Sequence, residues 1–136
     1  MKLKNNGERI KISRHIDVAE ASSVALRLGE LAGFSHTKRY MVATAVSELG
    51  TNISRYARDG EITIRIIENG NIKGIEIAAA DRGPGITDLE AAMKDSFSTS
   101  NSLGLGLPGV KRMMDEFEIE TEQGTGTHIV VRKWIK

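Results

Sequence analysis

The 136-residue sequence contains no cysteine. This absence excludes a disulfide scaffold, a thiol nucleophile and a zinc site built on thiolates. The sequence also lacks an excess of one charge, because 19 lysines and arginines stand against 18 acidic residues, a formal net charge of +1. Proteins held mainly by nucleic-acid phosphates or by an anionic membrane need a clear basic excess, so we expect neither as a partner.

Long apolar runs are absent as well. The start of the chain, Met1 to Gly7, has no apolar signal core, and no run approaches the roughly 18 residues that a membrane span needs. Apolar residues make up 40% of the chain and charged residues 27%, which is enough to bury a core. We therefore expect one soluble, cytoplasmic domain over residues 1–136.

Proline is scarce, with two residues, whereas glycine is abundant, with 14. The glycines lie in short clusters between periodic segments, which is not the pattern of a flexible low-complexity tract. These clusters are where candidate functional residues are expected.

The first half of the chain predicts a strand followed by two helices. Residues 8–13 alternate charged and apolar side chains, as a half-buried strand does. Asp17 is expected to cap a helix that stops near Gly33. The apolar face of this helix is expected to consist of Val24, Leu28 and Leu31. Ser35 is expected to cap a longer helix that ends near residues 59–60.

The second half predicts two hairpins that enclose further helices. Asn69-Gly70-Asn71 between residues 61–68 and 73–80 is a strong hairpin signal. After it we expect, in order, a short helix at 87–93, a mobile loop at 94–106, a helix at 107–115 with Pro108 in its first turn, and strands at 117–121 and 128–134. This order predicts an α/β (α+β) two-layer sandwich, with helices on one face of a mixed, mostly antiparallel sheet.

Polar side chains gather on one side of the second predicted helix. Glu48 and Asn52 are four residues apart, so they project one turn above the other. A carboxylate beside an amide oxygen suits a hard cation such as Mg²⁺, and the alternative is an exposed polar stripe. One turn further, the Arg55 guanidinium can meet phosphate oxygens and the Tyr56 ring can flank a base.

Three glycine-containing segments follow. In residues 81–86, Asp81 ends an apolar strand and needs a donor, which an adenine amine can supply; the alternative is an ordinary Asx-type turn. The glycines of this segment let the backbone approach a flat ligand. In residues 102–107, successive amides before a helix can point at phosphates. Residues 124–127 are by themselves typical of a hairpin turn.

The order of these motifs resembles the four ATP-binding boxes of the GHKL ATPases, the superfamily of gyrase, Hsp90, histidine kinases and MutL. Glu48-Leu49-Gly50-Thr51-Asn52 is similar to the N box and Asp81-Arg82-Gly83-Pro84-Gly85 to the G1 box. Gly104-Leu105-Gly106-Leu107 is similar to the G2 box and Gly124-Thr125-Gly126-Thr127 to the G3 box. The resemblance implies the Bergerat fold, with Mg·ATP between the helical layer and a mobile loop that acts as a lid.

The resemblance also implies a role for each matching residue. Glu48 would be the base that orients or deprotonates the acceptor hydroxyl, and Asn52 would hold Mg²⁺. Asp81 would accept a hydrogen bond from the adenine amine, and Thr127 would join the same network. The other nucleotide contacts would be Gly83, Gly85, Ile86 and Tyr56 at the base, and Arg55 with the backbone amides of Gly104, Leu105, Gly106 and Leu107 at the phosphates.

Within the superfamily the sequence is similar to the switch kinases of the stressosome. Ser47-Glu48-Leu49, Phe97-Ser98-Thr99-Ser100 and the segment from Gly104 to Phe117 carry this likeness. It implies an ATP- and Mg²⁺-dependent serine/threonine kinase that phosphorylates STAS-domain stressosome proteins. Once released from them, the kinase would activate a PP2C-type phosphatase in a general stress response.

Two other functions remain open at this point. One is an anti-sigma factor kinase that binds a sigma factor and phosphorylates an anti-anti-sigma STAS protein. The other is a non-catalytic module whose binding depends on nucleotide. Anti-sigma kinases of this group often carry an arginine before the G2 glycines, where this sequence has Asn101-Ser102-Leu103. This departure disfavours the first alternative, and the retention of Glu48 disfavours the second.

The same departure concerns the charge of the terminal phosphate. No lysine or arginine occurs between Lys94 and Lys111. The phosphate charge would therefore be neutralised by Mg²⁺, by Arg55 or Lys111, or by a residue of the partner. We predict slow turnover in the absence of the partner.

Overall fold

The computed structural model describes residues 2–3, 7–57, 59–85, 93 and 106–136. In chain order its elements are β1 (Lys2–Leu3), β2 (Glu8–Ile12), α1 (His15–Ala32), α2 (His36–Tyr56), β3 (Gly60–Asn69), β4 (Ile72–Asp81), α4 (Gly106–Met113), β5 (Glu116–Glu122) and β6 (Gly126–Trp134). The expected short helix at 87–93, apart from Met93, and residues 94–105 of the loop expected at 94–106 lie outside the described residues. Gly106 was expected in that loop but is the first residue of α4.

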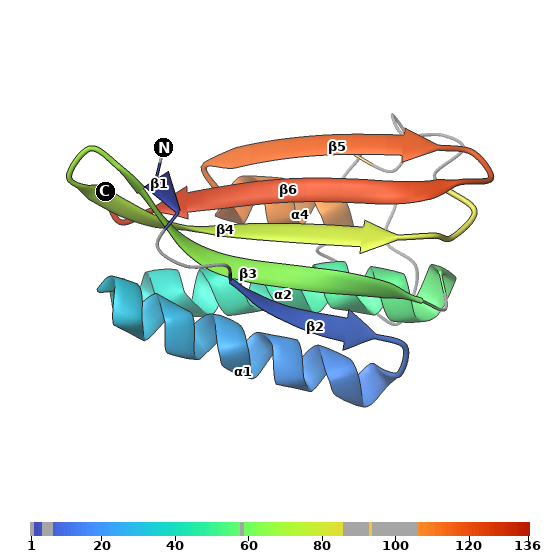
Figure 1. Ribbon diagram of the computed structural model, residues 1–136, viewed down its shortest axis with the longest axis horizontal. Helices are drawn as coiled ribbons and strands as arrows, with labels where there is room; N and C mark the ends of the chain where they lie inside the picture. Colours follow the sequence, from blue (N-terminus) through green and yellow to red (C-terminus); the bar gives the residue numbers. More distant parts are fainter. Residues whose placement is uncertain (1, 4–6, 58, 86–92, 94–105) are drawn as a thin grey trace.

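The strands form one six-stranded sheet in the order β1-β3-β4-β6-β5, with β2 also paired to β3. The helices lie on one side of this sheet, so the predicted two-layer sandwich is confirmed (Figure 1). Every pairing among the described strands is antiparallel, so the parallel component that a mixed sheet allows does not occur there. The two-residue strand β1 was not predicted, because so short a segment has no periodicity.

Alternate residues of the central strands make the apolar layer beneath the helices. In the register of the sheet, Ile62 of β3 lies opposite Ala79 of β4, which lies opposite Ile129 of β6. All three are buried in the core. Because strand side chains alternate between faces, the next residue of each strand points to the other side of the sheet.

Helix α1 begins three residues before the position expected with Asp17 as its cap. Asp17 is therefore the third helical residue and not the cap, and Arg14 stands at the cap position. The Asp17 carboxylate accepts hydrogen bonds from the backbone amides of Ser13 at 3.0 Å and Arg14 at 2.9 Å. These bonds favour the charged carboxylate and hold the pKa of Asp17 below its ordinary value of 3.8.

The buried face of α1 differs from the prediction at one position. Val24 and Leu28 are buried as expected, whereas Leu31 is 64% exposed. Ala32 takes the next buried position, because it follows Leu28 by four residues and so lies on the same face of the helix. Leu31 points about 100° away from Ala32 around the helix axis. The end of the helix at Gly33, with φ of 88°, is as predicted.

Helix α2 supplies four positions of the candidate site, Glu48, Asn52, Arg55 and Tyr56. Its start is as predicted, since the Ser35 hydroxyl accepts from the amide of Lys38 at 3.2 Å. It ends earlier than expected, at Tyr56, with Ala57 as its C-cap. A Cβ at Gly50 would lie 3.1 Å from the Val18 side chain, so this glycine allows α1 and α2 to pack closely.

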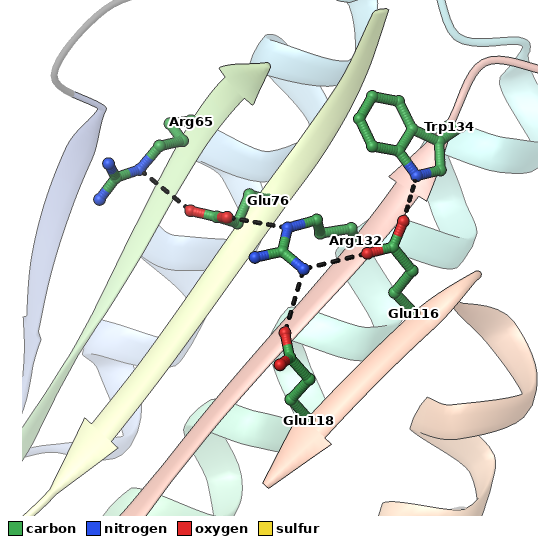
Figure 2. A network of polar contacts seen from close by, with 6 residues as sticks. All are labelled: Arg65, Glu76, Glu116, Glu118, Arg132 and Trp134. Atoms are coloured by element: carbon green, nitrogen blue, oxygen red, sulfur yellow. Dashed lines mark hydrogen bonds and ion pairs between the residues drawn. The ribbon is translucent and has the colours of Figure 1, made fainter. Parts of the chain in front are cut away.

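The sheet face opposite the helices carries a charged network (Figure 2). Arg132 donates to Glu76 at 2.9 Å, to Glu116 at 3.0 Å and to Glu118 at 3.1 Å. Arg65 lies 3.4 Å from the other oxygen of Glu76, and the Trp134 indole donates to Glu116 at 2.6 Å (Figure 2). Cross-strand pairs thus join β3, β4, β6 and β5 on this face.

Among the helices of the described residues, none combines the length and apolar character that a membrane crossing requires.

Candidate functional site

The predicted site residues come from α2, from the start of α4 and from one end of the sheet. At that end, on the right in Figure 1, β4 finishes, β6 begins and α2 reaches its C-terminus. Three chain segments that are far apart in the sequence therefore meet there.

Glu48 of α2 contacts the start of α4 directly. Its Oε1 accepts a hydrogen bond from the backbone amide of Gly106 at 2.9 Å. The two residues are separated by 58 positions in the sequence. A carboxylate at the N-terminus of a helix is favoured by the free amides and by the helix dipole. The contact thus joins the predicted N box to the predicted G2 box. Among the residues that the structure describes, it leaves the second carboxylate oxygen of Glu48 for another donor.

Asp81, the last residue of β4, organises the other end of the site. Its Oδ1 accepts from the amide of Gly83 at 2.8 Å and from the amide of Thr127 at 3.3 Å. The first bond is the Asx-type turn weighed above, and the second ties β4 to the start of β6. Within the described part of the chain, both of these bonds go to Oδ1. Oδ2 can therefore accept from a ligand.

Two glycines allow this close arrangement. A Cβ at Gly83 would lie 2.7 Å from the Cβ of Ala57, at the end of α2. A Cβ at Gly126 would lie 2.1 Å from the carbonyl oxygen of Asp81. Any larger residue at either position would push apart the segments that hold Asp81, so glycine is required for close approach here.

The predicted G1 and G3 segments also touch beyond Asp81. The amide of Gly124 donates to the carbonyl of Pro84 at 2.7 Å. Gly85 has φ of 79°, and a Cβ there would lie 2.5 Å from the carbonyl oxygen of Glu122. The segment at 124–127 is thus a hairpin turn, as its sequence indicates, and it also packs on the segment that follows β4.

The remaining predicted residues of α2 line the same side of the helix. Asn52 lies one turn after Glu48 and is partly buried, whereas Arg55 and Tyr56 are exposed, Tyr56 by 54%. From Glu48 to Ala57 the helix is about 13 Å long. That length is comparable with an extended nucleoside triphosphate, whose base would lie near Asp81 and whose phosphates would lie near Gly106.

Leu107 differs from the other predicted residues. Its side chain is 5% exposed and belongs to the hydrophobic core. Leu107 can therefore meet a phosphate only through its backbone amide, which is the role that the resemblance implies. Of the other predicted contacts, Ile86, Gly104 and Leu105 lie outside the described residues.

Two residues that contact elements of the site were not predicted from the sequence. Thr121 of β5 lies beside Thr127, with 2.9 Å between their hydroxyl oxygens. Lys133 of β6 is 7% exposed, and its ammonium donates to the carbonyl of Met113 at the end of α4 at 2.7 Å. Helix α4 is thus held by a carboxylate at its first residue and by a cation at its last. Neither residue belongs to a motif, and only the strand register would have indicated them.

The chain matches a family of ATPase domains over most of its length. The family model described as "Histidine kinase-like ATPase domain" matches residues 13–133. Among solved structures, the mycobacterial sensor histidine kinase MprB superposes with a TM-score of 0.55 at 17% identity, covering 94% of this chain and 97% of that one. At this identity the likeness supports the fold only.

Curated relatives are more similar in sequence. Serine/threonine-protein kinase RsbT of Bacillus subtilis (strain 168) is 40% identical over 132 residues, 97% of this chain and 99% of that protein. The anti-sigma F factor of Clostridium beijerinckii is 35% identical over 97 residues, 68% of either chain. The anti-sigma F factor of Caldanaerobacter subterraneus subsp. tengcongensis is 38% identical over 102 residues, 69% of this chain and 68% of that protein.

Proposed function

The chain belongs to the histidine kinase-like ATPase family, on the branch that contains serine/threonine-protein kinase RsbT, and on this premise we propose that it is a partner-switching protein kinase. It transfers a phosphoryl group from Mg·ATP to a serine or threonine of a STAS-domain protein. The observation that carries the proposal is the contact of Glu48 with the amide of Gly106. It sets a carboxylate next to the backbone that would bind the phosphates.

The nucleotide would lie along α2. Asp81 Oδ2 would accept from the adenine amine, because Oδ1 already accepts from the amides of Gly83 and Thr127. The amide of Leu107, beside the Gly106 amide that already donates to Glu48, would meet a phosphate, and Arg55 would reach phosphate oxygens from the exposed end of α2. The Tyr56 ring would flank the base.

The amide oxygen of Asn52 fits Mg²⁺, which prefers hard oxygen ligands and takes few of them from the protein. Asn52 is partly buried one turn from Glu48, so a cation there would lie on the side of α2 that carries the predicted base. When bound, Mg²⁺ would neutralise phosphate charge.

Glu48 would act on the acceptor hydroxyl. Its Oε1 is held by Gly106, which fixes the orientation of the carboxylate. Its second oxygen would accept the proton of the serine or threonine hydroxyl while the hydroxyl oxygen attacks the terminal phosphorus of ATP. The bond from that phosphorus to the β-phosphate oxygen would break, and ADP would leave. A positioned base of this kind contributes roughly 10²- to 10⁴-fold to the rate.

The biological setting follows from the resemblance to the stressosome switch kinases. The substrates would be stressosome STAS proteins, and the kinase released from them would activate a PP2C-type phosphatase in a general stress response. The kinase domain would span residues 1–136 and would act in the cytoplasm. Turnover without the partner would be slow, because the segment between Lys94 and Lys111 contains no lysine or arginine that could neutralise the terminal phosphate.

One specific observation favours a second candidate function. Anti-sigma F factors match about two thirds of the chain at 35% and 38% identity. An anti-sigma kinase would use the same nucleotide site, but it would also bind a sigma factor stoichiometrically. The sequence Asn101-Ser102-Leu103 in place of an arginine makes this the less favoured candidate.

The test is phosphorylation of a purified STAS-domain protein from the same genome, read by intact mass after incubation with Mg·ATP. We expect the wild type to add one phosphoryl group, and Glu48→Gln to lower the rate at least roughly 100-fold. Glu20→Gln, on the exposed side of α1, is the matched control and should behave as the wild type.

A wild type that binds nucleotide and transfers no phosphate would contradict the kinase and favour a non-catalytic module. Full activity of Glu48→Gln would remove Glu48 from the mechanism. Stoichiometric capture of a sigma factor would favour the anti-sigma function.

A further inference from the structure

Three side chains lie in one row across the end of the sheet. Asp81 of β4 pairs in register with Thr127 of β6, and Thr127 pairs with Thr121 of β5. Each lies two residues along its strand from a residue of the apolar layer, Ala79, Ile129 and Ile119 respectively. Because strand side chains alternate, the whole row points to the helix side of the sheet, where the nucleotide would bind.

The row is connected by hydrogen bonds at both steps. The amide of Thr127 donates to Asp81 Oδ1 at 3.3 Å. The hydroxyl oxygens of Thr127 and Thr121 are 2.9 Å apart, and either can be the donor. The Thr121 hydroxyl also lies 3.4 Å from the carbonyl of Gly126, which is a longer and weaker contact.

The direction of the hydroxyl pair decides what Thr127 offers to a ligand. If Thr121 donates to Thr127, the proton of Thr127 is left for a ligand, and Thr127 is a donor. If Thr127 donates to Thr121, Thr127 presents only lone pairs to a ligand. In the first arrangement Thr121 donates across 2.9 Å to Thr127, which is shorter than its 3.4 Å contact with the carbonyl of Gly126. A bond received from Thr121 also polarises the Thr127 hydroxyl and strengthens it as a donor.

We propose that Thr121 is a positioning residue for base selectivity: its hydroxyl donates to Thr127 and so holds the Thr127 proton toward the nucleobase. This inference rests on the proposed nucleotide site. Together the row then presents an acceptor, Asp81 Oδ2, beside a donor, the Thr127 hydroxyl. Adenine offers the complementary pair, an amine donor at position 6 and an acceptor at N1.

A guanine in the same orientation is mismatched at both points. Its O6 oxygen would face the carboxylate of Asp81, and its N1 hydrogen would face the proton of Thr127. A carboxylate by itself does not exclude guanine, since it can accept from guanine's own N–H groups. The discrimination therefore depends on whether Thr127 is kept as a donor. A site that leaves polar groups unpaired against the wrong ligand rejects it strongly.

An ordinary cross-strand threonine pair, which stabilises the β5–β6 hairpin and nothing more, is the alternative. The two readings differ in what Thr121→Val does. Valine has the shape of threonine without the hydroxyl. A hairpin role would lower stability and leave base preference unchanged, whereas a positioning role would change the preference.

The experiment measures the affinities of Mg·ADP and Mg·GDP by calorimetry for the full chain, for Thr121→Val and for Thr121→Ser. We expect Thr121→Val to weaken ADP binding roughly three- to tenfold, the range that one net hydrogen bond is worth. GDP should be weakened less or not at all, so that the ratio of the two affinities falls. Thr121→Ser keeps a hydroxyl and should restore the wild-type ratio.

Each outcome decides the matter. An unchanged ADP affinity in Thr121→Val, or an equal loss for ADP and GDP, overturns the positioning role. Thr121→Ser behaving as Thr121→Val does the same. If the wild type binds neither ADP nor ATP, the proposed nucleotide site fails and the inference falls with it. A wild type that binds ADP, with selectivity insensitive to Thr121, overturns the inference alone.

Discussion

Asp81 combines a structural and a ligand-facing acceptor in one carboxylate. Oδ1 accepts from the amides of Gly83 and Thr127, and so fixes the segment after β4 against the start of β6. Oδ2 is the oxygen that would take the adenine amine. An isosteric substitution can therefore separate the two roles.

We predict that Asp81→Asn folds as the wild type and loses nucleotide affinity. The asparagine Oδ1 can still accept from both amides, while its NH₂ group replaces the acceptor by a donor that opposes the adenine amine. The expected loss of ATP affinity is roughly 10- to 100-fold. Calorimetry gives the affinity and thermal unfolding gives the fold control. An ATP affinity equal to that of the wild type would show that the base does not contact Asp81.

At this scale the sequence predicts residues whose chemistry is local. Asp81 is predictable because it ends an apolar strand and precedes two glycines within the same segment. Thr121 is not predictable in the same way, because its partner Thr127 lies across a turn and the pairing depends on the β5–β6 register. The contact of Glu48 with Gly106 spans 58 residues and needs the packed molecule.

At the scale of elements, the turn between β5 and β6 holds one side of the site. The β5–β6 turn contains Gly124 and Gly126, both with positive φ, at 85° and 140°. Only Gly126 is also in close contact, since a Cβ there would lie 2.1 Å from the Asp81 carbonyl oxygen. A Cβ at Gly124 would have nothing within 4 Å.

Alanine at these two glycines should therefore have different effects. Gly124→Ala meets only the backbone strain of positive φ, about 1 kcal/mol, and should keep nucleotide affinity. Gly126→Ala adds a clash between strands, so we expect a loss of more than about 3 kcal/mol and of nucleotide binding. Chemical denaturation and calorimetry on both variants check this. Equal losses in the two variants would show that backbone strain, and not the close approach of Gly126 to Asp81, determines the loss of stability.

The start of α1 gives a pH prediction. The pKa of Asp17 is lowered mainly by the hydrogen bonds that its carboxylate accepts from the amides of Ser13 and Arg14. A lowered pKa in the folded state means stability that is present above the unfolded pKa and is lost as the pH falls through the folded value. Asp17→Ala should therefore be less stable than the wild type at pH 7.

As the pH falls below 3.8, the ordinary value for Asp17, the difference should shrink toward zero. Urea denaturation at a series of pH values measures it. Glu20→Ala, one turn along the same helix and exposed, is the control for removing a carboxylate from α1, and its stability at pH 7 should equal that of the wild type. A difference that grows toward acid pH would contradict the assignment.

The elements were predictable wherever periodicity and turn chemistry agree. The β3–β4 hairpin follows from Asn69-Gly70, and α2 begins at its serine cap. The wrong predictions concern where helices begin or end and which residues of α1 are buried. Asp17 is typical of a helix cap, but it is the third residue of α1 and accepts hydrogen bonds from the amides before the helix. Leu31 fits the spacing of a buried apolar face, but Ala32 is the residue that is buried there. Small residues such as alanine are weak signals for a buried face.

On the scale of the whole molecule, the sheet separates two faces with different roles. The helix side carries the apolar layer and the row of Asp81, Thr127 and Thr121. The opposite side carries the charged network centred on Arg132 (Figure 2). The Arg132 side chain is 19% exposed and the Glu76 side chain 14%, so these charges are well shielded from water.

Arg132→Met should therefore affect stability and not the site. It leaves Glu76 and Glu116 without their shared partner, which we expect to cost about 1–3 kcal/mol. Nucleotide affinity should equal that of the wild type, because the network lies on the face opposite the helices. Denaturation and calorimetry on one preparation test both statements. A loss of affinity at full stability would show that the two faces are coupled.

The fold was predictable at this scale because hairpins and helices in this order have few arrangements that bury every apolar face. The antiparallel pairings of β3 with β4 and of β5 with β6 follow from the two hairpins, whereas the pairing of β2 with β3 spans both α1 and α2. The opposing charges at the ends of α4 were not predictable, since Lys133 and Glu48 come from β6 and α2.

The most direct test of the account is to locate the nucleotide on the chain by titrating the ¹⁵N-labelled protein with Mg·ADP and following the backbone amides. We predict that the amides of Gly83, Gly106 and Thr127 shift together with one affinity. The amide of Gly70, in the exposed β3–β4 turn, should stay unmoved. Shifts at Gly70 without shifts at Gly83 and Gly106, or no shifts at all, would contradict a nucleotide site along α2.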